Sequence, residues 1–190
     1  MIRVAVLGDI GSGKSFLASS FGYPVFNADL VVSSLYKKNK LLFNKLKKIF
    51  PKKINSFPIN KNDVMDVIKS NPKNLLKIVK IVHPLVRKEM NIFLKKNTNK
   101  KMVILDIPLL LENKLNLKTD ILVFVDANKK IILQKLKKRK NFNLQIYKLF
   151  KNIQLSLETK KNMADFVIKN NFNSAKLKKE AKNLTNKILL

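Results

Sequence analysis

Short apolar runs separated by longer amphipathic segments are the main pattern along this chain. Predominantly apolar runs of strand length occur at residues 2–7, 24–28, 102–107 and 121–125, and a shorter run follows at 166–168. Runs of this kind, without polar alternation, are typical of strands buried on both faces. Because they alternate with helical segments, the pattern predicts an α/β fold with a parallel sheet covered by helices on both faces.

The segments between these runs carry apolar residues at helical spacing. They predict helices at 14–21, 30–50, 63–69, 73–94, 129–139 and 144–163, and a final amphipathic helix through Leu177, Ala181, Leu184 and Ile188. Pro84 predicts a kink or a new first turn within its helix, and residues 51–62 are interpreted as a loop. The region from about 30 to 101 shows no clear strand, so we expect a helical insertion within a single domain spanning residues 1–190.

The composition narrows the possible classes of protein. A chain of 190 residues, 46% of them hydrophobic, suits one domain with an ordinary core. The absence of cysteine and the single histidine exclude disulfides, thiolate metal sites and histidine-rich metal sites. The N-terminus opens directly into a strand-like run, and no stretch approaches the roughly 18 apolar residues of a membrane span. We therefore expect a cytoplasmic protein without a membrane partner.

The charge of the chain is strongly positive. The formal net charge is +28, from 40 Lys and Arg against 12 Asp and Glu, which indicates a polyanionic partner such as nucleic acid or a phosphorylated substrate. However, the excess is almost all lysine spread along the chain, asparagine is abundant, and few aromatic residues lie among the basic runs. We interpret the charge chiefly as the codon usage of an A/T-biased genome and do not expect a nucleic-acid partner.

Residues 8–15, with the sequence G-D-I-G-S-G-K-S, match the phosphate-binding pattern G-x-x-x-x-G-K-[ST]. They lie between an apolar strand and a helix, and they include three of the 4 glycines in the chain. Glycines let backbone N–H groups close around phosphate oxygens. The predicted ATP site consists of Gly8, Gly11, Ser12, Gly13, Lys14, Ser15 and Phe16. Lys14 would reach the β- and γ-phosphates, and the Ser15 hydroxyl would bind Mg²⁺.

A phosphate loop alone does not separate kinases from GTPases and motor ATPases. The segment Asn113-Lys114-Leu115-Asn116 lacks the aspartate of an N-K-x-D-type base-reading motif, and motor ATPases are usually longer. The short chain, the helical insertion and a pair of basic helices favour a small-molecule kinase with a helical lid at about residues 129–155.

Further motifs narrow the kinase class. They are residues 11–15 (G-S-G-K-S), 27–29 (N-A-D), 83–86 (H-P-L-V), 106–112 (D-I-P-L-L-L-E), Gln154 and 164–170 (A-D-F-V-I-K-N). In this order and spacing, from residue 2 to about 171, they resemble the dephospho-coenzyme A kinase family. The resemblance implies transfer of the ATP γ-phosphate to the 3′-hydroxyl of dephospho-coenzyme A, the last step of coenzyme A biosynthesis.

The resemblance also implies roles for residues on the acceptor side. Asp29 ends the second strand, at the edge where ligands gather in parallel sheets, and stands where the family has its proposed base. Its alternative role is the N-cap of the next helix. His83 matches the family's acceptor-binding insertion, with a purely structural role as the alternative, and Lys61 is the second predicted acceptor-binding residue.

The donor side has its own candidates. Asp106 follows three apolar residues, as in a Walker B strand, and is the predicted metal ligand, with Glu112 as the open alternative. Arg139 matches a family arginine in the lid and is predicted to be catalytic with Asp29 and Lys14, because a guanidinium binds phosphate through two donors. The alternative for this basic helix is a solvated lysine-rich face.

The chain departs from the family pattern at several positions. Asp9 stands where glycine is usual, Phe16 replaces threonine, Asn27 replaces aspartate, and lysines replace arginines at Lys61 and Lys135. The core of the motif is kept, so we expect an active enzyme. Two alternatives stay open: another small-molecule or nucleotide P-loop kinase, and a P-loop ATPase that binds nucleic acid.

Overall fold

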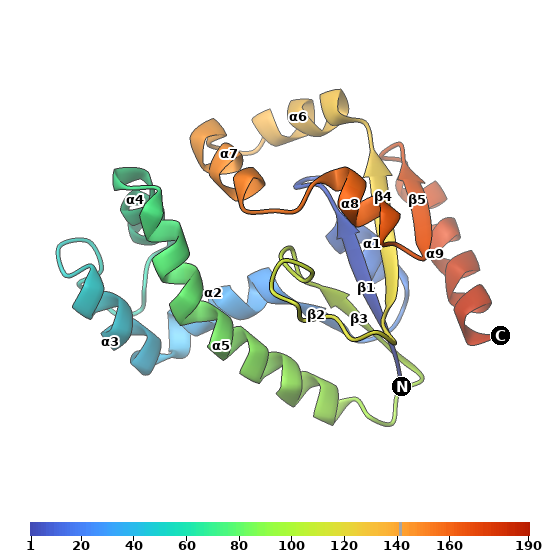
Figure 1. Ribbon diagram of the computed structural model, residues 1–190, viewed down its shortest axis with the longest axis horizontal. Coiled ribbons are helices and arrows are strands. Elements are labelled where there is room, and N and C mark those ends of the chain that lie inside the picture. Colours follow the sequence, from blue (N-terminus) through green and yellow to red (C-terminus); the bar gives the residue numbers. More distant parts are fainter. Residues whose placement is uncertain (141) are drawn as a thin grey trace.

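The computed structural model describes residues 1–140 and 142–190; residue 141, which falls within the predicted lid, lies outside the described residues. Within this part of the chain, one sheet of five parallel strands has the order β2-β3-β1-β4-β5 (Figure 1). The strands are β1 (Ile2–Gly8), β2 (Val25–Asn27), β3 (Met102–Asp106), β4 (Ile121–Ala127) and β5 (Phe166–Asn170). The helices are α1 (Lys14–Ser20), α2 (Ala28–Lys38), α3 (Lys40–Ile49), α4 (Lys61–Ser70), α5 (Lys73–Lys96), α6 (Lys129–Lys137), α7 (Leu144–Asn152), α8 (Leu157–Asn162) and α9 (Ser174–Leu189).

Helices cover both faces of the sheet, as the apolar strands predict. Successive side chains of a strand point to opposite faces, so Val4 and Val6 of β1 pack in one core with α1 and α9. Ala5 and Leu7 belong to a second, larger core that also contains residues of α2, α3, α4, α5 and α7. The strands are apolar throughout because both of their faces are buried, and the predicted α/β class is confirmed.

The carboxyl ends of the strands meet at one edge of the sheet. Asn27 at the end of β2 lies opposite Asp106 at the end of β3, and Ala127 of β4 lies opposite Asn170 of β5. β1 ends between them at Gly8, where the chain turns into the loop before α1. In a parallel sheet this edge collects the polar residues that follow the strands.

The predicted helix over residues 30–50 is wrong in one respect, because the chain forms two helices that meet at Asn39. The backbone N–H of Asn39 donates to the Leu35 carbonyl at the end of α2 (2.9 Å). Its side chain accepts a hydrogen bond from the N–H of Leu42 in the first turn of α3 (2.8 Å). Asparagine is a favoured N-cap, so one residue ends the first helix and begins the second.

Two further helix boundaries differ from the sequence-based expectation. Residues 144–163 form two helices, because Ser156 accepts a hydrogen bond from the Thr159 N–H (3.0 Å) and begins α8. In contrast, α5 runs without interruption through Pro84, so no new helix begins there. The packing of its apolar stripe into the larger core holds the helix together across the missing N–H.

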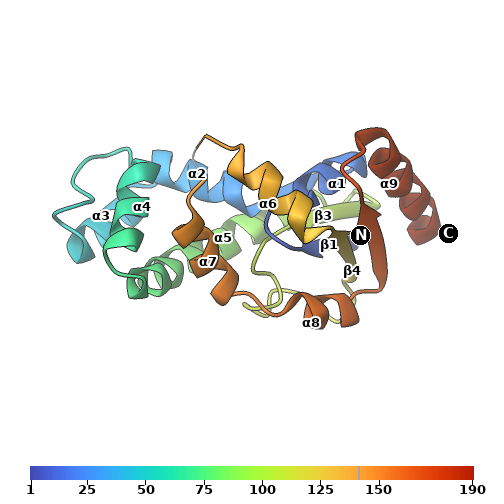
Figure 2. The same cartoon turned by 90° about the horizontal axis from the view of Figure 1, so that it is seen from above.

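The helices divide into groups around the sheet edge. α2, α3, α4 and α5 extend away from the sheet on one side, while α6 and α7 lie beyond the carboxyl ends of the strands (Figure 1 and Figure 2). α4 contacts α7, so the two groups meet across this edge. No helix among residues 1–140 and 142–190 is both long and apolar enough to cross a membrane.

Candidate active site

The loop of residues 8–15 is held in a conformation that requires glycine. Gly13 has a φ of 97°, and a side chain at this position would collide with the amide group of Asn170. That amide donates a hydrogen bond to the Ser12 carbonyl (2.7 Å), although 158 residues separate the two in sequence. The Asn170 carbonyl oxygen accepts from the N–H of Phe172 (2.7 Å), which fixes the orientation of the amide. The last strand therefore supports the phosphate loop directly.

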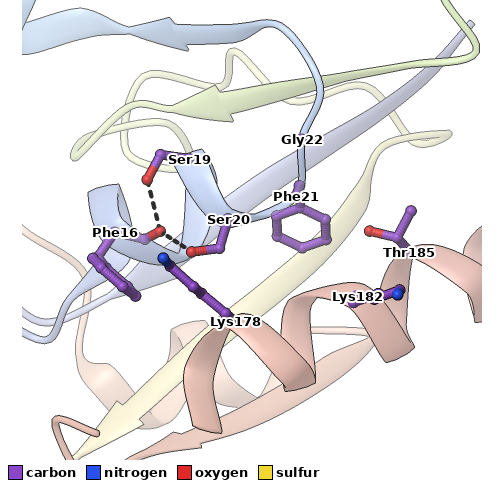
Figure 3. A pocket seen from close by; sticks show the side chains of 8 residues that line it. All are labelled: Phe16, Ser19, Ser20, Phe21, Gly22, Lys178, Lys182 and Thr185. Carbon is purple, nitrogen blue, oxygen red and sulfur yellow. Dashed lines mark hydrogen bonds between the residues drawn. The ribbon is translucent and has the colours of Figure 1, made fainter. Parts of the chain in front are cut away.

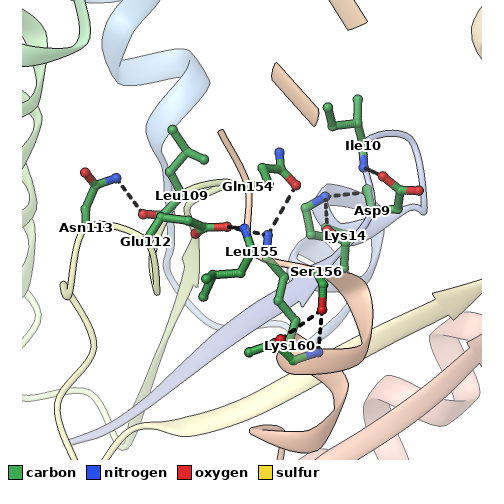
Figure 4. A network of polar contacts seen from close by, with 12 residues as sticks. Asp9, Ile10, Lys14, Leu109, Glu112, Asn113, Gln154, Leu155, Ser156 and Lys160 are labelled. Carbon is green, nitrogen blue, oxygen red and sulfur yellow. Dashed lines mark hydrogen bonds and ion pairs between the residues drawn. The ribbon is translucent and has the colours of Figure 1, made fainter. Parts of the chain in front are cut away.

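The ammonium group of Lys14 lies at the centre of the site. Its Nζ donates to the carbonyl oxygens of Gly8 (3.2 Å) and Asp9 (2.6 Å) within its own loop (Figure 4). Burial lowers the pKa of Lys14 from 10.5 to about 8, and the nearby Lys160 acts in the same direction, while Asp106, Asp9 and Asp29 oppose the shift. The Lys14 ammonium group is therefore poorly solvated, and an anion that binds beside it would stabilise its charge.

The charges of two carboxylates at the carboxyl edge of the sheet, Asp106 at the end of β3 and Asp29 just after β2, act on this lysine. Asp106 is buried and accepts a hydrogen bond from the Asn27 side-chain amide (2.6 Å). Asp29 lies in the first turn of α2 and has an exposed side chain. Partial desolvation, and then the charge of Asp106, raise the pKa of Asp29, whereas Lys14 and Lys61 lower it. The expectation that Asp29 ends the second strand is wrong, because β2 ends at Asn27, but the charges of Asp29 and Lys14 do act on each other at this edge of the sheet.

Asn27, and not Asp29, is the N-cap of α2. The Asn27 side-chain oxygen accepts from the N–H of Leu30 (2.9 Å), while its amide nitrogen binds Asp106. The alternative role that the sequence left open for Asp29 is therefore wrong, and the Asp29 carboxylate is not engaged in capping the helix.

A buried ion pair that the sequence did not reveal lies next to these groups. Lys160 of α8 is 2% exposed, and its Nζ lies 2.8 Å from Glu112 Oε1 and 3.2 Å from Gln154 Oε1 (Figure 4). The same Glu112 oxygen accepts from the N–H of Leu155 (2.9 Å). Glu112 thus ties the segment after β3 to the segment between α7 and α8, and its charge is already paired.

The predicted acceptor residues lie on the insertion. Lys61 begins α4 and is exposed, yet its charge acts on Asp29 across the site. His83 lies in the middle of α5, partly buried. Burial, and then Arg87, lower the pKa of His83, and a hydrogen bond with the side chain of Asn113 opposes them. The charge of Lys61 lowers the pKa of Asp29 without a direct contact between the two among the described residues, while the polar contact of His83 is to the loop that follows β3.

The basic residues of α6 lie on the other side of the loop. Leu136 of α6 packs close to Gly11, where a side chain would contact it. Lys135 Nζ lies 4.9 Å from the centre of the Phe172 ring, so this lysine binds an aromatic face next to Asn170. Arg139 is exposed in the turn after α6, and among the described residues no hydrogen bond or ion pair involves its guanidinium group.

A separate open groove lies behind the loop, between α1 and α9. It has a volume of about 600 Å³ and is lined by Phe16, Ser19, Ser20, Phe21, Gly22, Lys178, Lys182 and Thr185 (Figure 3). Phe16, which the sequence assigns to the nucleotide site, is half-exposed here, and its carbonyl accepts from the hydroxyls of Ser19 (2.9 Å) and Ser20 (2.7 Å). The carboxylates of the site do not line this groove.

The donor groups of the site suit a particular kind of metal binding. Among the described residues, no three His, Cys, Asp or Glu side chains converge on one point. Mg²⁺ characteristically uses one or two protein groups together with water and phosphate oxygens. Asp106 and the exposed Ser15 hydroxyl therefore fit an ion that enters with a nucleotide, and do not form a closed metal site.

The parallel sheet, its phosphate loop and the lysine within that loop define a P-loop nucleotide-binding protein. Solved structures agree on the fold: a protein from Thermus thermophilus matches with a TM-score of 0.77 at 25% identity, over 100% of this chain and 98% of the other. Dephospho-CoA kinase from Campylobacter jejuni matches with a TM-score of 0.66 at 21% identity, over 98% and 96% of the two chains.

Sequence comparisons identify the family. The profile described as Dephospho-CoA kinase matches residues 2–176. A protein of Wolbachia pipientis wMel with the name Dephospho-CoA kinase is 35% identical over 170 residues, which are 87% of each chain. The chain belongs to the dephospho-CoA kinase family, whose activity is the last step of coenzyme A biosynthesis, with ATP as the phosphate donor. The resemblance stated from the motifs is confirmed.

Proposed function

We propose that this chain binds ATP at residues 8–15 and that Asp29 receives or orients the 3′-hydroxyl of dephospho-coenzyme A during transfer of the γ-phosphate. The observation that carries this proposal is the grouping of Asp29, Asp106 and Lys14 at the carboxyl edge of the sheet. A carboxylate with a raised pKa beside a phosphate-binding lysine suits a base that accepts the proton of an attacking hydroxyl.

The residues around Asp29 support a place for the acceptor. Lys61 acts on Asp29 from α4, so a negatively charged acceptor placed between them would meet a cation on the insertion. His83 lies further along α5 and, with its lowered pKa, is uncharged at neutral pH, which suits hydrogen bonding and not charge pairing. The acceptor would therefore lie between the sheet edge and the insertion of about residues 30–101.

The lid of about residues 129–155 would close the site on the nucleotide side. Lys135 lies on α6, which packs against Gly11 through Leu136, and Arg139 follows that helix, so both would bring positive charge toward the triphosphate. Ser15 and Asp106 would hold Mg²⁺, which supplies charge neutralisation at the β- and γ-phosphates. Asp106 is the better ligand candidate of the two acids, because Glu112 is committed to Lys160.

The test measures ADP release with ATP and Mg²⁺, with and without dephospho-coenzyme A, and checks the product by mass for one added phosphate. Asp29→Asn is expected to keep ATP binding and to lower kcat by about 10²- to 10⁴-fold, the usual range for a lost general base. Lys14→Ala is expected to abolish turnover. An unchanged rate for Asp29→Asn would remove that residue from the chemistry, and release stimulated only by another metabolite would overturn the acceptor assignment.

A further inference from the structure

Asp9 places a carboxylate inside the phosphate loop. It occupies the second position of the motif and is 3% exposed. Its Oδ1 accepts a hydrogen bond from the N–H of Ile10 (2.7 Å), and its backbone carbonyl accepts from Lys14 Nζ (2.6 Å) (Figure 4). The same carbonyl also accepts from the Ser12 N–H (3.1 Å). A negative charge in this place opposes the binding of a polyanion unless a cation neutralises it.

The neutralising cation comes from α7. Lys151 Nζ lies 2.6 Å from Asp9 Oδ2, and its side chain is 29% exposed, so the pair is partly shielded from solvent. Tyr147, one turn earlier on α7, is close enough to respond to the same carboxylate: burial first, and then Asp9, raise the pKa of Tyr147, while Lys151 opposes them. Two residues of α7 thus lie beside Asp9, although Asp9 and Lys151 are 142 residues apart in sequence.

We propose that Lys151 is a positioning residue for ATP, because its pairing with Asp9 neutralises the carboxylate inside the phosphate loop and holds α7 against that loop. The proposal rests on the proposed binding of ATP at residues 8–15. Because Oδ1 binds the Ile10 N–H and Oδ2 binds Lys151, neither Asp9 oxygen points an unpaired charge at the incoming phosphates. The same contact joins the predicted lid to the loop before the nucleotide arrives.

The alternative is an ordinary ion pair that has no influence on the nucleotide. The two interpretations differ in what happens when each partner is removed alone. If Lys151 compensates Asp9, its loss leaves an uncompensated carboxylate near the triphosphate, and removing that carboxylate as well restores binding. An ordinary pair would affect folding stability in both cases but would not show this rescue of nucleotide affinity.

The experiment measures the dissociation constant of a non-hydrolysable ATP analogue with Mg²⁺ by calorimetry, and the KM values of both substrates, on the full chain. Lys151→Met is expected to raise the dissociation constant for the analogue about 10- to 100-fold, the effect of one uncompensated charge several ångströms away at an effective dielectric constant of about 20. Lys151→Arg and the double variant Asp9→Asn with Lys151→Met are expected to bind within about threefold of the unaltered protein. The KM for dephospho-coenzyme A should stay unchanged.

Lys148→Met is the matched control, since Lys148 lies on the same helix, one turn from Lys151, and is exposed. It removes the same charge and should leave the affinity unchanged. An equal loss for both lysine variants, or a double variant as weak as Lys151→Met, would overturn the proposal. If Lys151→Met fails to fold, Asp9→Asn alone tests the proposal. If Lys151 serves to neutralise Asp9, the Asp9→Asn variant should bind the ATP analogue at least as tightly as the unaltered protein, and a tenfold weaker binding would contradict the proposal. Absence of analogue binding by the unaltered protein would instead overturn the proposed function.

Discussion

Replacement of Lys160 in α8 by methionine removes a buried cation but keeps a side chain of similar length and apolar character in the same place. Lys160 and Glu112 are 2% and 11% exposed in their side chains and lie 2.8 Å apart, so the pair is largely shielded from water. After the substitution, Glu112 Oε1 keeps only the N–H of Leu155, and Oε2 is already buried without a partner among the described residues. The variant therefore contains a buried carboxylate without its counter-ion.

The size of the effect follows from this burial. Removing one member of a buried ion pair costs about 3–5 kcal/mol, because the remaining charge is left unpaired. For a chain of 190 residues, each kcal/mol corresponds to a shift in Tm of about 2–4 °C. Lys160→Met is therefore expected to lower Tm by about 6–20 °C. Glu112→Gln should also destabilise the fold, because it leaves the Lys160 ammonium buried without a counter-ion, although the new side chain can still accept from Leu155 and from Lys160.

A double-mutant cycle measured by urea unfolding tests the reasoning. The variant that combines Glu112→Gln with Lys160→Met contains no unpaired charge, so its loss should be at least about 2 kcal/mol smaller than the sum of the single losses. The reasoning is refuted if Lys160→Met costs less than about 1 kcal/mol, or if the two effects are additive. A second readout is the pKa of Lys14, which should rise when the charge of Lys160 is gone.

Three further predictions concern single features. The kcat/KM for ATP should fall as the pH rises through about 8, because the free enzyme then loses the proton of Lys14. In contrast, kcat should stay constant to higher pH, because bound phosphates raise the pKa of Lys14. A pH profile of kcat/KM without this fall would contradict the assignment of Lys14 to the ATP site. Gly13→Ala should abolish analogue binding in calorimetry, since φ is 97° and the new methyl group meets Asn170; near-normal binding would show that the loop can adapt. Asn39→Ala should lower the free energy of unfolding by about 0.5–2 kcal/mol without changing kcat, and urea unfolding with a turnover assay measures both.

Much of the fold was predictable because burial on both faces leaves an apolar signature. The strands stand out as runs without polar alternation, and the order in which they alternate with helices predicts a parallel sheet. The helix boundaries at Asn39 and Ser156 were not predicted, since apolar residues keep helical spacing on both sides of each break. The signal was present in both residues, which are favoured N-caps, but such residues also occur at many positions that do not break a helix.

The site was predictable to the extent that its chemistry lies in local motifs. The loop of residues 8–15 and Asp29 could be placed because strand ends of a parallel sheet converge. Lys160 and Lys151 could not be found in this way, because one lysine among 40 Lys and Arg carries no distinguishing sequence signal. Only the tertiary structure shows that Lys160 is buried against Glu112 and that Lys151 pairs with Asp9.

The hydrogen bond from Asn170 to the Ser12 carbonyl has a consequence for folding during synthesis on the ribosome. The loop is among the first segments synthesised, but the residue that supports it is made 158 residues later. At about 5–20 residues per second, this delay is on the order of 10–30 s. During that time the nascent chain carries the complete nucleotide motif without its support from β5. The loop therefore gains this support only late in synthesis, after the last strand has joined the sheet.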